Sequence, residues 1–178
     1  APTNMNYTTS KFVKKFVRGE SRGKVNWDTL QKLRNKWKGN LIVKGVMHPD
    51  DAVKIKKYGV DAVYISNHGG RQLDSAPVAI SMLPKIREAV GSKYPLILDS
   101  GIRSGSDILK SLALGANFVM IGRPLMYAIG ADGNKGLKKI LEILKNELSV
   151  SLGLVGLTDI NDVDNSIISS NLLSNLEY

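Results

Sequence analysis

The sequence lacks cysteine altogether, and it contains only two histidines among its 178 residues. Without cysteine there can be no disulfide bond, no thiolate metal ligand and no cysteine nucleophile, which fits a reducing compartment. No apolar run is as long as the roughly 20 residues that span a membrane, and the first residues form no hydrophobic signal core. With 43% hydrophobic and 23% charged residues, we expect a soluble, globular domain with a sizeable core.

Aromatic residues are also scarce, at 6% of the chain, although the formal net charge is +9. Proteins that bind single-stranded nucleic acids usually stack bases on aromatic side chains, and here the aromatic residues do not alternate with the basic ones. We interpret most of the lysines as solvent-exposed residues on the surfaces of helices. We therefore expect no nucleic-acid partner, and we expect the positive charge to serve anionic small molecules or an anionic surface.

Four short apolar runs predict strands, at residues 41–46, 61–66, 95–100 and 117–122. Each run is almost continuously apolar, which is typical of parallel strands that are buried on both faces. Helical patterns separate them, at 48–59, 81–91 and 105–116, and further helices are predicted at 25–37 and 135–156. The alternation predicts an α/β fold of four βα units, which is half of an eight-stranded barrel or a small open sheet.

Polar residues and glycines accompany all four predicted strands near their carboxyl ends. In α/β folds these ends meet on one side of the sheet, where ligands bind. The third and fourth ends offer glycines, helix N-termini and two arginines, which together favour a phosphate site. The residues concerned are Lys44 and Gly45 in the first strand; Ser66, Asn67, His68, Gly69, Gly70 and Arg71 after the second; Asp99, Ser100, Gly101 and Arg103 after the third; and Gly122 and Arg123 after the fourth.

His68 and Arg71 follow the same strand and suggest a reaction on an anionic substrate. Imidazole can act as a base near neutral pH, and a guanidinium can bind a carboxylate through two hydrogen bonds. Lys44 lies in a run predicted to be buried, where it could face a group that gains negative charge or could pair with Asp99. His48 precedes a proline and two aspartates, so we interpret it as a residue at a helix start.

Four motifs, taken together and in this order, resemble a known family: "LIVKGV", "SNHGGRQLD", "DSGIRSGSDILKSLALGA" and "IGRP". They are similar to the C-terminal half of the FMN-dependent α-hydroxy-acid oxidases and dehydrogenases, which include glycolate oxidase, lactate oxidase, L-lactate dehydrogenase and mandelate dehydrogenase. The match runs from about Trp27 to about Ile168. The resemblance implies the last four βα units of a TIM (β/α)8 barrel, with residues 1–24 as a flexible loop segment, 25–168 as the half barrel and 169–178 as a tail.

The resemblance also implies a role for each matching position. His68 would be the active-site base, and Arg71 would bind the substrate carboxylate. Lys44 would lie beside the flavin and stabilise its anionic reduced form, and Ser66 would contact the flavin ring. The ribityl chain and phosphate would be held by Asp99, Ser100, Gly101, Ile102, Arg103, Gly122 and Arg123. No metal is implied.

The expected activity is the FMN-dependent oxidation of a small L-2-hydroxy acid, of lactate, glycolate or mandelate type, to the 2-oxo acid. The electron acceptor would be oxygen, a quinone or a cytochrome. The family's N-terminal half, which supplies further flavin and substrate contacts, has no counterpart in this sequence, so we expect the isolated chain to be inactive.

When complete, the protein is expected to be a cytoplasmic homo-oligomer, a tetramer. For the basic residues at 11–18 we consider two alternatives. They form part of an active-site loop, or they contact the inner face of the membrane. The main competing interpretation is a non-catalytic half barrel that binds phosphate or flavin, in which His68 plays no part.

Overall fold

The computed structural model describes residues 25–169, which fall into two units divided between Gly39 and Asn40. In the first unit, helix α2 spans Trp27–Lys36, and the side chain of Asn26 caps its N-terminus by accepting a hydrogen bond from the backbone N–H of Thr29. This confirms the helix predicted at 25–37. The segment 1–24, for which we predicted a loop or a membrane contact, lies outside the described residues.

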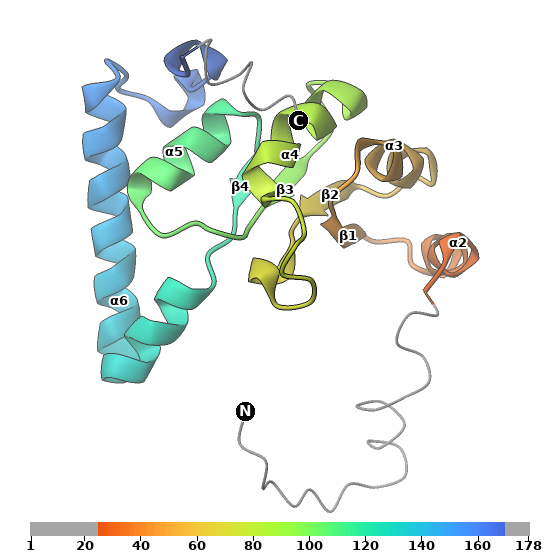
Figure 1. Ribbon diagram of the computed structural model, residues 1–178, viewed down its shortest axis with the longest axis horizontal. Coiled ribbons are helices and arrows are strands. Elements are labelled where there is room, and N and C mark those ends of the chain that lie inside the picture. The colour runs from red at the N-terminus through yellow and green to blue at the C-terminus, as the bar shows by residue number, and fades with distance from the viewer. Residues whose placement is uncertain (1–24, 170–178) are drawn as a thin grey trace, which may run out of the picture. The chain divides into compact units, whose positions relative to one another are not determined.

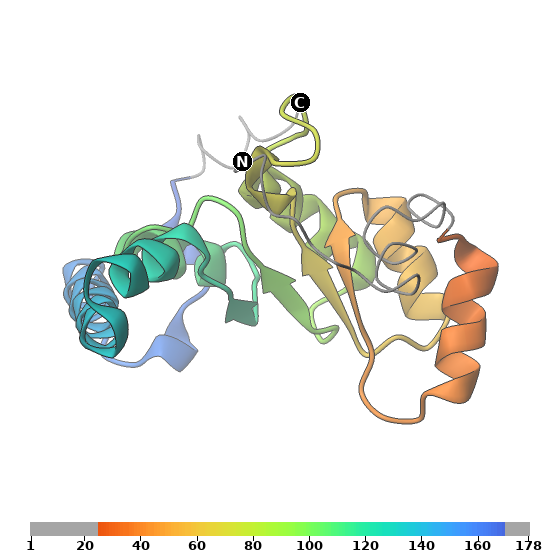
Figure 2. The ribbon, with the colours of Figure 1, turned by 90° about the horizontal axis from the view of Figure 1, so that it is seen from below.

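The second unit contains one parallel sheet in the order β1-β2-β3-β4 (Figures 1 and 2). Its strands are β1 (Ile42–Val46), β2 (Ala62–Ile65), β3 (Leu96–Leu98) and β4 (Phe118–Val119). All four predicted strands are therefore present, and each is shorter than its apolar run. The strand order follows the chain order, as expected for successive right-handed βαβ units.

The helices between the strands begin and end at recognisable signals. Helix α3 (Pro49–Lys57) starts at His48, whose ring accepts a hydrogen bond from the Asp50 backbone N–H, so His48 is the helix-start residue we predicted. Helix α4 (Ala79–Val90) ends at Gly91, and α5 (Gly105–Ala113) begins with a capping box between Ser104 and Asp107. Helix α6 (Arg123–Leu154) starts earlier than the predicted 135 and is interrupted by non-helical backbone at Asp132 and Gly133.

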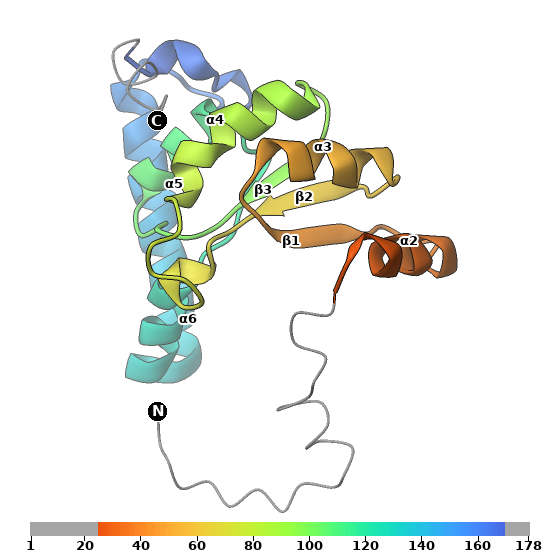
Figure 3. The same ribbon diagram turned by 45° about the vertical axis from the view of Figure 1, so that its right-hand side comes forward.

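One face of the sheet is packed against helices and forms the core. Helices α3 and α4 lie together on the same side of β1–β3 (Figure 3), and α5 packs between β4 and α6. The side chains that point to this side are fully buried, among them Val63, Ile65, Leu96 and Leu98. Two single-turn 3-10 helices follow α6, η2 (Ile160–Asp162) and η3 (Asn165–Ile167).

The opposite face of the sheet is not covered within residues 25–169, which corrects our expectation that the strands are buried on both faces. Ile42 is 48% exposed and Phe118 is 59% exposed. Lys44, which we expected to be buried, has a side chain that is 49% exposed for the same reason. In a closed barrel this face would line the interior, so its exposure is what half of a barrel would show.

None of the helices in the described part of the chain is long and apolar enough to cross a membrane.

Candidate functional site

The carboxyl ends of the four strands surround a cavity of about 180 Å³. Ten of the eleven residues to which the resemblance assigns a role line this cavity, although they come from four separate segments of the chain. They are Lys44, His68, Arg71, Asp99, Ser100, Gly101, Ile102, Arg103, Gly122 and Arg123. The eleventh, Ser66, is buried and lines a neighbouring cavity of about 690 Å³, which also borders Lys44 and His68. The fold therefore brings the predicted residues together.

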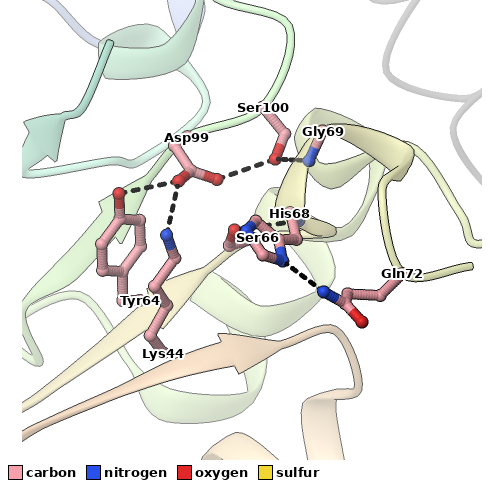
Figure 4. A network of polar contacts seen from close by, with 8 residues as sticks. All are labelled: Lys44, Tyr64, Ser66, His68, Gly69, Gln72, Asp99 and Ser100. Carbon is pink, nitrogen blue, oxygen red and sulfur yellow. Dashed lines mark hydrogen bonds and ion pairs between the residues drawn. The ribbon is translucent and has the colours of Figure 1, made fainter. Parts of the chain in front are cut away.

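Asp99 is the centre of a polar network between the strand ends (Figure 4). Its Oδ2 atom accepts a hydrogen bond from the Tyr64 hydroxyl at 2.7 Å and lies 3.2 Å from the ammonium nitrogen of Lys44. Its Oδ1 atom accepts a hydrogen bond from the Ser100 hydroxyl at 2.7 Å. The contact between Lys44 and Asp99 is the ion pair that the sequence left as one alternative for this lysine.

The charge of Asp99 is stabilised by these donors. Burial by itself would raise the pKa of Asp99, but the hydrogen bonds that the carboxylate accepts lower it overall. The donors are Ser66, Ser100, Tyr64 and Lys44. The same network raises the pKa of the Tyr64 hydroxyl, through burial first and then through its hydrogen bond to Asp99 and the negative charge there. At neutral pH the site thus contains a carboxylate and a neutral phenol.

The turn after β2 holds His68 in an uncommon backbone conformation. His68, Gly69 and Gly70 have φ angles of 58°, 65° and 75°, and glycine adopts such values much more readily than histidine. The backbone N–H of His68 donates to Ser66 Oγ at 3.1 Å, and the N–H of Gly69 donates to Ser100 Oγ at 3.2 Å. These bonds join the turn to the ends of β2 and β3, so the backbone that carries the imidazole is anchored to two strands.

The imidazole of His68 has one close polar neighbour in the described part of the chain. Its Nδ1 atom lies 3.2 Å from Nε2 of Gln72, an amide nitrogen that can only donate, so Nδ1 is the acceptor in this contact. Both side chains border the larger cavity. A neutral histidine that accepts this hydrogen bond at Nδ1 carries its own proton on Nε2, so the contact with Gln72 influences which ring nitrogen is free.

Three guanidinium groups line the smaller cavity, those of Arg71, Arg103 and Arg123. Within residues 25–169 none of them forms an ion pair. Arg103 lies just before the N-terminus of α5, and Arg123 is the first residue of α6, so the cations stand beside two helix N-termini. Unpaired arginines beside helix N-termini favour an anionic ligand, and phosphate fits this chemistry.

The glycines around this cavity leave room for such a ligand. A Cβ atom placed on Gly101 or Gly122 would meet no atom within 4 Å, and a Cβ on Gly69 would lie 3.5 Å from the Arg123 guanidinium. The backbone is therefore accessible where it borders the cavity. The described residues contain no group of three or more His, Asp or Glu side chains that could hold a metal ion.

Two residues of the site, Tyr64 and Gln72, were not predicted. Tyr64 lies within an apolar run, where a tyrosine reads as part of the core, and Gln72 lies in a loop. The signal that could have found Tyr64 is the two-residue alternation along β2, which places it on the same face as Ser66. Asn67 was noted only as a polar strand-end residue, and its buried Oδ1 atom has no hydrogen-bond partner within residues 25–169.

Comparison with known proteins identifies relatives of this site and fold. The family model described as FMN-dependent dehydrogenase matches residues 2–170. A 2-hydroxyacid oxidase of Dictyostelium discoideum is 46% identical over 144 residues, which are 81% of this chain and 37% of that protein. An L-lactate dehydrogenase of Pseudomonas syringae is 44% identical over 144 residues, 81% of this chain and 38% of that protein.

Solved structures that are similar to this chain have related enzyme names. Mandelate oxidase with (S)-2-phenylpropionate superposes with a TM-score of 0.75 at 37% identity, covering 79% of this chain and 42% of that one. The monotopic membrane protein (S)-mandelate dehydrogenase superposes with a TM-score of 0.81 at 36% identity, covering 92% of this chain and 44% of that one. The chain thus spans less than half the length of these relatives and has the fold of the C-terminal half of a TIM barrel. It belongs to the FMN-dependent dehydrogenase family, whose members include 2-hydroxyacid oxidases and lactate dehydrogenases.

Proposed function

We propose that this chain forms the FMN-binding and proton-transferring half of an enzyme that oxidises a small L-2-hydroxy acid to the 2-oxo acid. The observation that carries the proposal is the convergence of His68, Arg71, Lys44 and the two arginines Arg103 and Arg123 on one cavity. A base, a carboxylate-binding cation and an anion-binding pair are the groups that this reaction needs from the protein.

The residues present fit FMN by the chemistry of their donors. Arg103 and Arg123, with the helix N-termini beside them, would hold the phosphate, and the open backbone at Gly101 and Gly122 would admit it closely. Asp99, Ser100 and Ile102 would border the ribityl chain, and Ser66 and Lys44 would lie toward the ring. Bound FMN would supply a two-electron acceptor for the oxidation.

The substrate would be held and deprotonated by residues of the turn after β2. Arg71 would bind the carboxylate with its planar guanidinium, which fixes the orientation of the acid as well as its position. His68 would then accept a proton from the substrate's α-hydroxy carbon or its hydroxyl at a ring nitrogen. Lys44 would stabilise the negative charge that develops beside it during the reaction.

The complete site would include residues that this chain does not contain. The uncovered face of the sheet and the share of the relatives' length that is matched both support the proposal that a second barrel half completes the protein. We therefore propose that 25–168 acts only together with such a half. We further propose that the completed protein passes its electrons to oxygen, a quinone or a cytochrome, that it assembles as a tetramer, and that it is cytoplasmic with a peripheral membrane contact.

The FMN part of the proposal is tested by flavin affinity. In the native protein that contains these residues, Arg103→Gln and Arg123→Gln should each weaken FMN binding by about tenfold to a hundredfold, because each removes a charge-assisted hydrogen bond to phosphate. Fluorescence titration of the flavin-free protein measures this. Lys110→Gln is the matched control, since it removes an exposed cation of α5 that does not line the cavity. Unchanged affinity in both arginine variants would refute the phosphate site.

A further inference from the structure

Tyr64 contacts both members of the Lys44–Asp99 ion pair, one through its hydroxyl and the other through its ring (Figure 4). Its hydroxyl donates to Asp99 Oδ2 at 2.7 Å, the same atom that lies 3.2 Å from the Lys44 ammonium. Its ring centroid lies 4.7 Å from that ammonium, within the range of a cation–π contact. The tyrosine thus touches the anion through a hydrogen bond and the cation through its ring.

The sheet register fixes this arrangement. Lys44 and Tyr64 are direct partners across β1 and β2, and Tyr64 is the partner of Ile97 across β2 and β3. Asp99 follows Ile97 by two residues, which places it on the same face of the sheet, one step nearer the cavity. The backbone therefore holds the phenol, the ammonium and the carboxylate next to one another on adjacent strands.

The other oxygen of Asp99 is also occupied, so the carboxylate has little freedom to turn. Oδ1 accepts from Ser100, whose Oγ in turn accepts from the Gly69 backbone N–H. On Oδ2 the Tyr64 hydroxyl and the Lys44 ammonium share one acceptor atom. The hydrogen bond from the Tyr64 hydroxyl polarises Asp99 Oδ2 and reduces the negative charge that this oxygen presents to Lys44. Asp99 therefore neutralises less of the Lys44 charge than it would without the Tyr64 hydroxyl.

We propose that Tyr64 is a positioning residue of the FMN site: through Asp99 and through its own ring it holds the Lys44 ammonium at the cavity and preserves the positive charge that Lys44 presents there. This inference rests on the proposed function, which assigns Lys44 to the flavin. Tyr64 itself does not line either cavity, so it acts through Lys44 and Asp99 and not on the ligand. The other charged groups that face the smaller cavity are Arg71, Arg103 and Arg123.

The first test needs no flavin. Tyr64→Phe removes the hydroxyl and keeps the ring, so the pKa of Asp99 should rise in the flavin-free native protein, because the carboxylate loses a hydrogen-bond donor. Carbon-13 NMR of labelled aspartate, with Asp99→Asn to assign the signal, follows this titration. The matched control is Tyr94→Phe, whose hydroxyl donates to the Val60 carbonyl at 2.8 Å away from both cavities. An Asp99 titration that is the same in Tyr64→Phe and wild type would overturn the proposal.

The second test uses the flavin-loaded protein and measures the reduction potential. In Tyr64→Phe, Asp99 neutralises more of the Lys44 charge at neutral pH, so reduction to the anionic flavin should become less favourable, by roughly threefold to tenfold in the equilibrium constant. Tyr64→Leu, which also lacks the ring, should show a larger loss, and Tyr94→Phe should show none. A raised Asp99 pKa with an unchanged potential would reduce Tyr64 to a structural residue and overturn the inference.

The two tests separate this inference from the proposed function. A native protein that binds no FMN would defeat the proposed function before any potential is measured, and with it the role of Tyr64 toward the flavin. A protein that binds FMN normally but shows no effect of Tyr64→Phe would defeat only the inference about Tyr64.

Discussion

Replacing His68 with alanine should slow the reduction of bound FMN by a 2-hydroxy acid about 10²- to 10⁴-fold, which is the usual contribution of a positioned general base. Flavin affinity should stay unchanged, because the proposed phosphate contacts lie on Arg103 and Arg123. Anaerobic stopped-flow absorbance of the native protein, mixed with excess hydroxy acid, measures the rate. A pure loss of rate with flavin still bound is the signature of a residue that acts on the substrate.

The second histidine provides the control. His48 caps the N-terminus of α3 and lines neither cavity, so His48→Ala should leave the reduction rate unchanged and lower the free energy of unfolding by about 1 kcal/mol. If His68→Ala reduced its flavin as fast as the wild type, His68 would have no catalytic role. The interpretation as a non-catalytic, flavin-binding or phosphate-binding half barrel would then be preferred.

Replacing Gly105 with alanine should destabilise the fold by about 3 kcal/mol or more, at the upper end of the usual cost of overpacking. A Cβ atom on Gly105 would lie 2.0 Å from the backbone nitrogen of Leu148 and 2.4 Å from the backbone carbon of Glu147, so the first turn of α5 would have to move away from α6. That movement would also break the hydrogen bond from the Gly105 N–H to the Glu147 carboxylate, which is 2.8 Å long. Urea unfolding of the native protein measures the loss.

The matched control is another helical glycine. A Cβ atom on Gly130, in the first part of α6, would meet no atom within 4 Å, so Gly130→Ala should be neutral or should stabilise the fold by up to about 1 kcal/mol. Because α5 begins two residues after Arg103, the Gly105 variant should also weaken FMN binding. Equal stability of the two alanine variants would mean that α5 and α6 are not packed as closely as described.

Much of the fold follows from local patterns in the sequence. The four apolar runs predicted the strands, because buried parallel strands need continuous apolar residues. The end of β1 was predicted correctly, whereas β2, β3 and β4 end before the predicted residues. After β3, the Asp99 backbone N–H still donates to the Ile65 carbonyl, but Ser100 has a φ of 76°, so the extended backbone ends there. The interruption of α6 at Asp132 and Gly133 was not predicted, because both residues fall before the regular helical pattern at 135.

The sequence predicted the site residues that belong to a motif at the end of one strand. It did not predict the contacts that form between residues of different strands. His68, Arg71, Arg103 and Arg123 belong to motifs that are read along the chain. The contact between Tyr64 and Asp99 depends on the register of β2 against β3, which the sequence pattern does not specify to one residue. The exposure of Lys44 likewise follows from the uncovered sheet face, which no single run reveals.

The most direct test of the account is the anaerobic addition of an L-2-hydroxy acid to the native protein that contains these residues, with the visible absorption of its flavin recorded. We expect FMN to be present and its oxidised band to disappear with L-lactate, (S)-mandelate or the achiral glycolate, and to persist with D-lactate or (R)-mandelate. A protein that holds FMN and keeps its colour with all three acids, or one that binds no flavin, would contradict the proposal that His68 and Arg71 act on a hydroxy acid at this cavity.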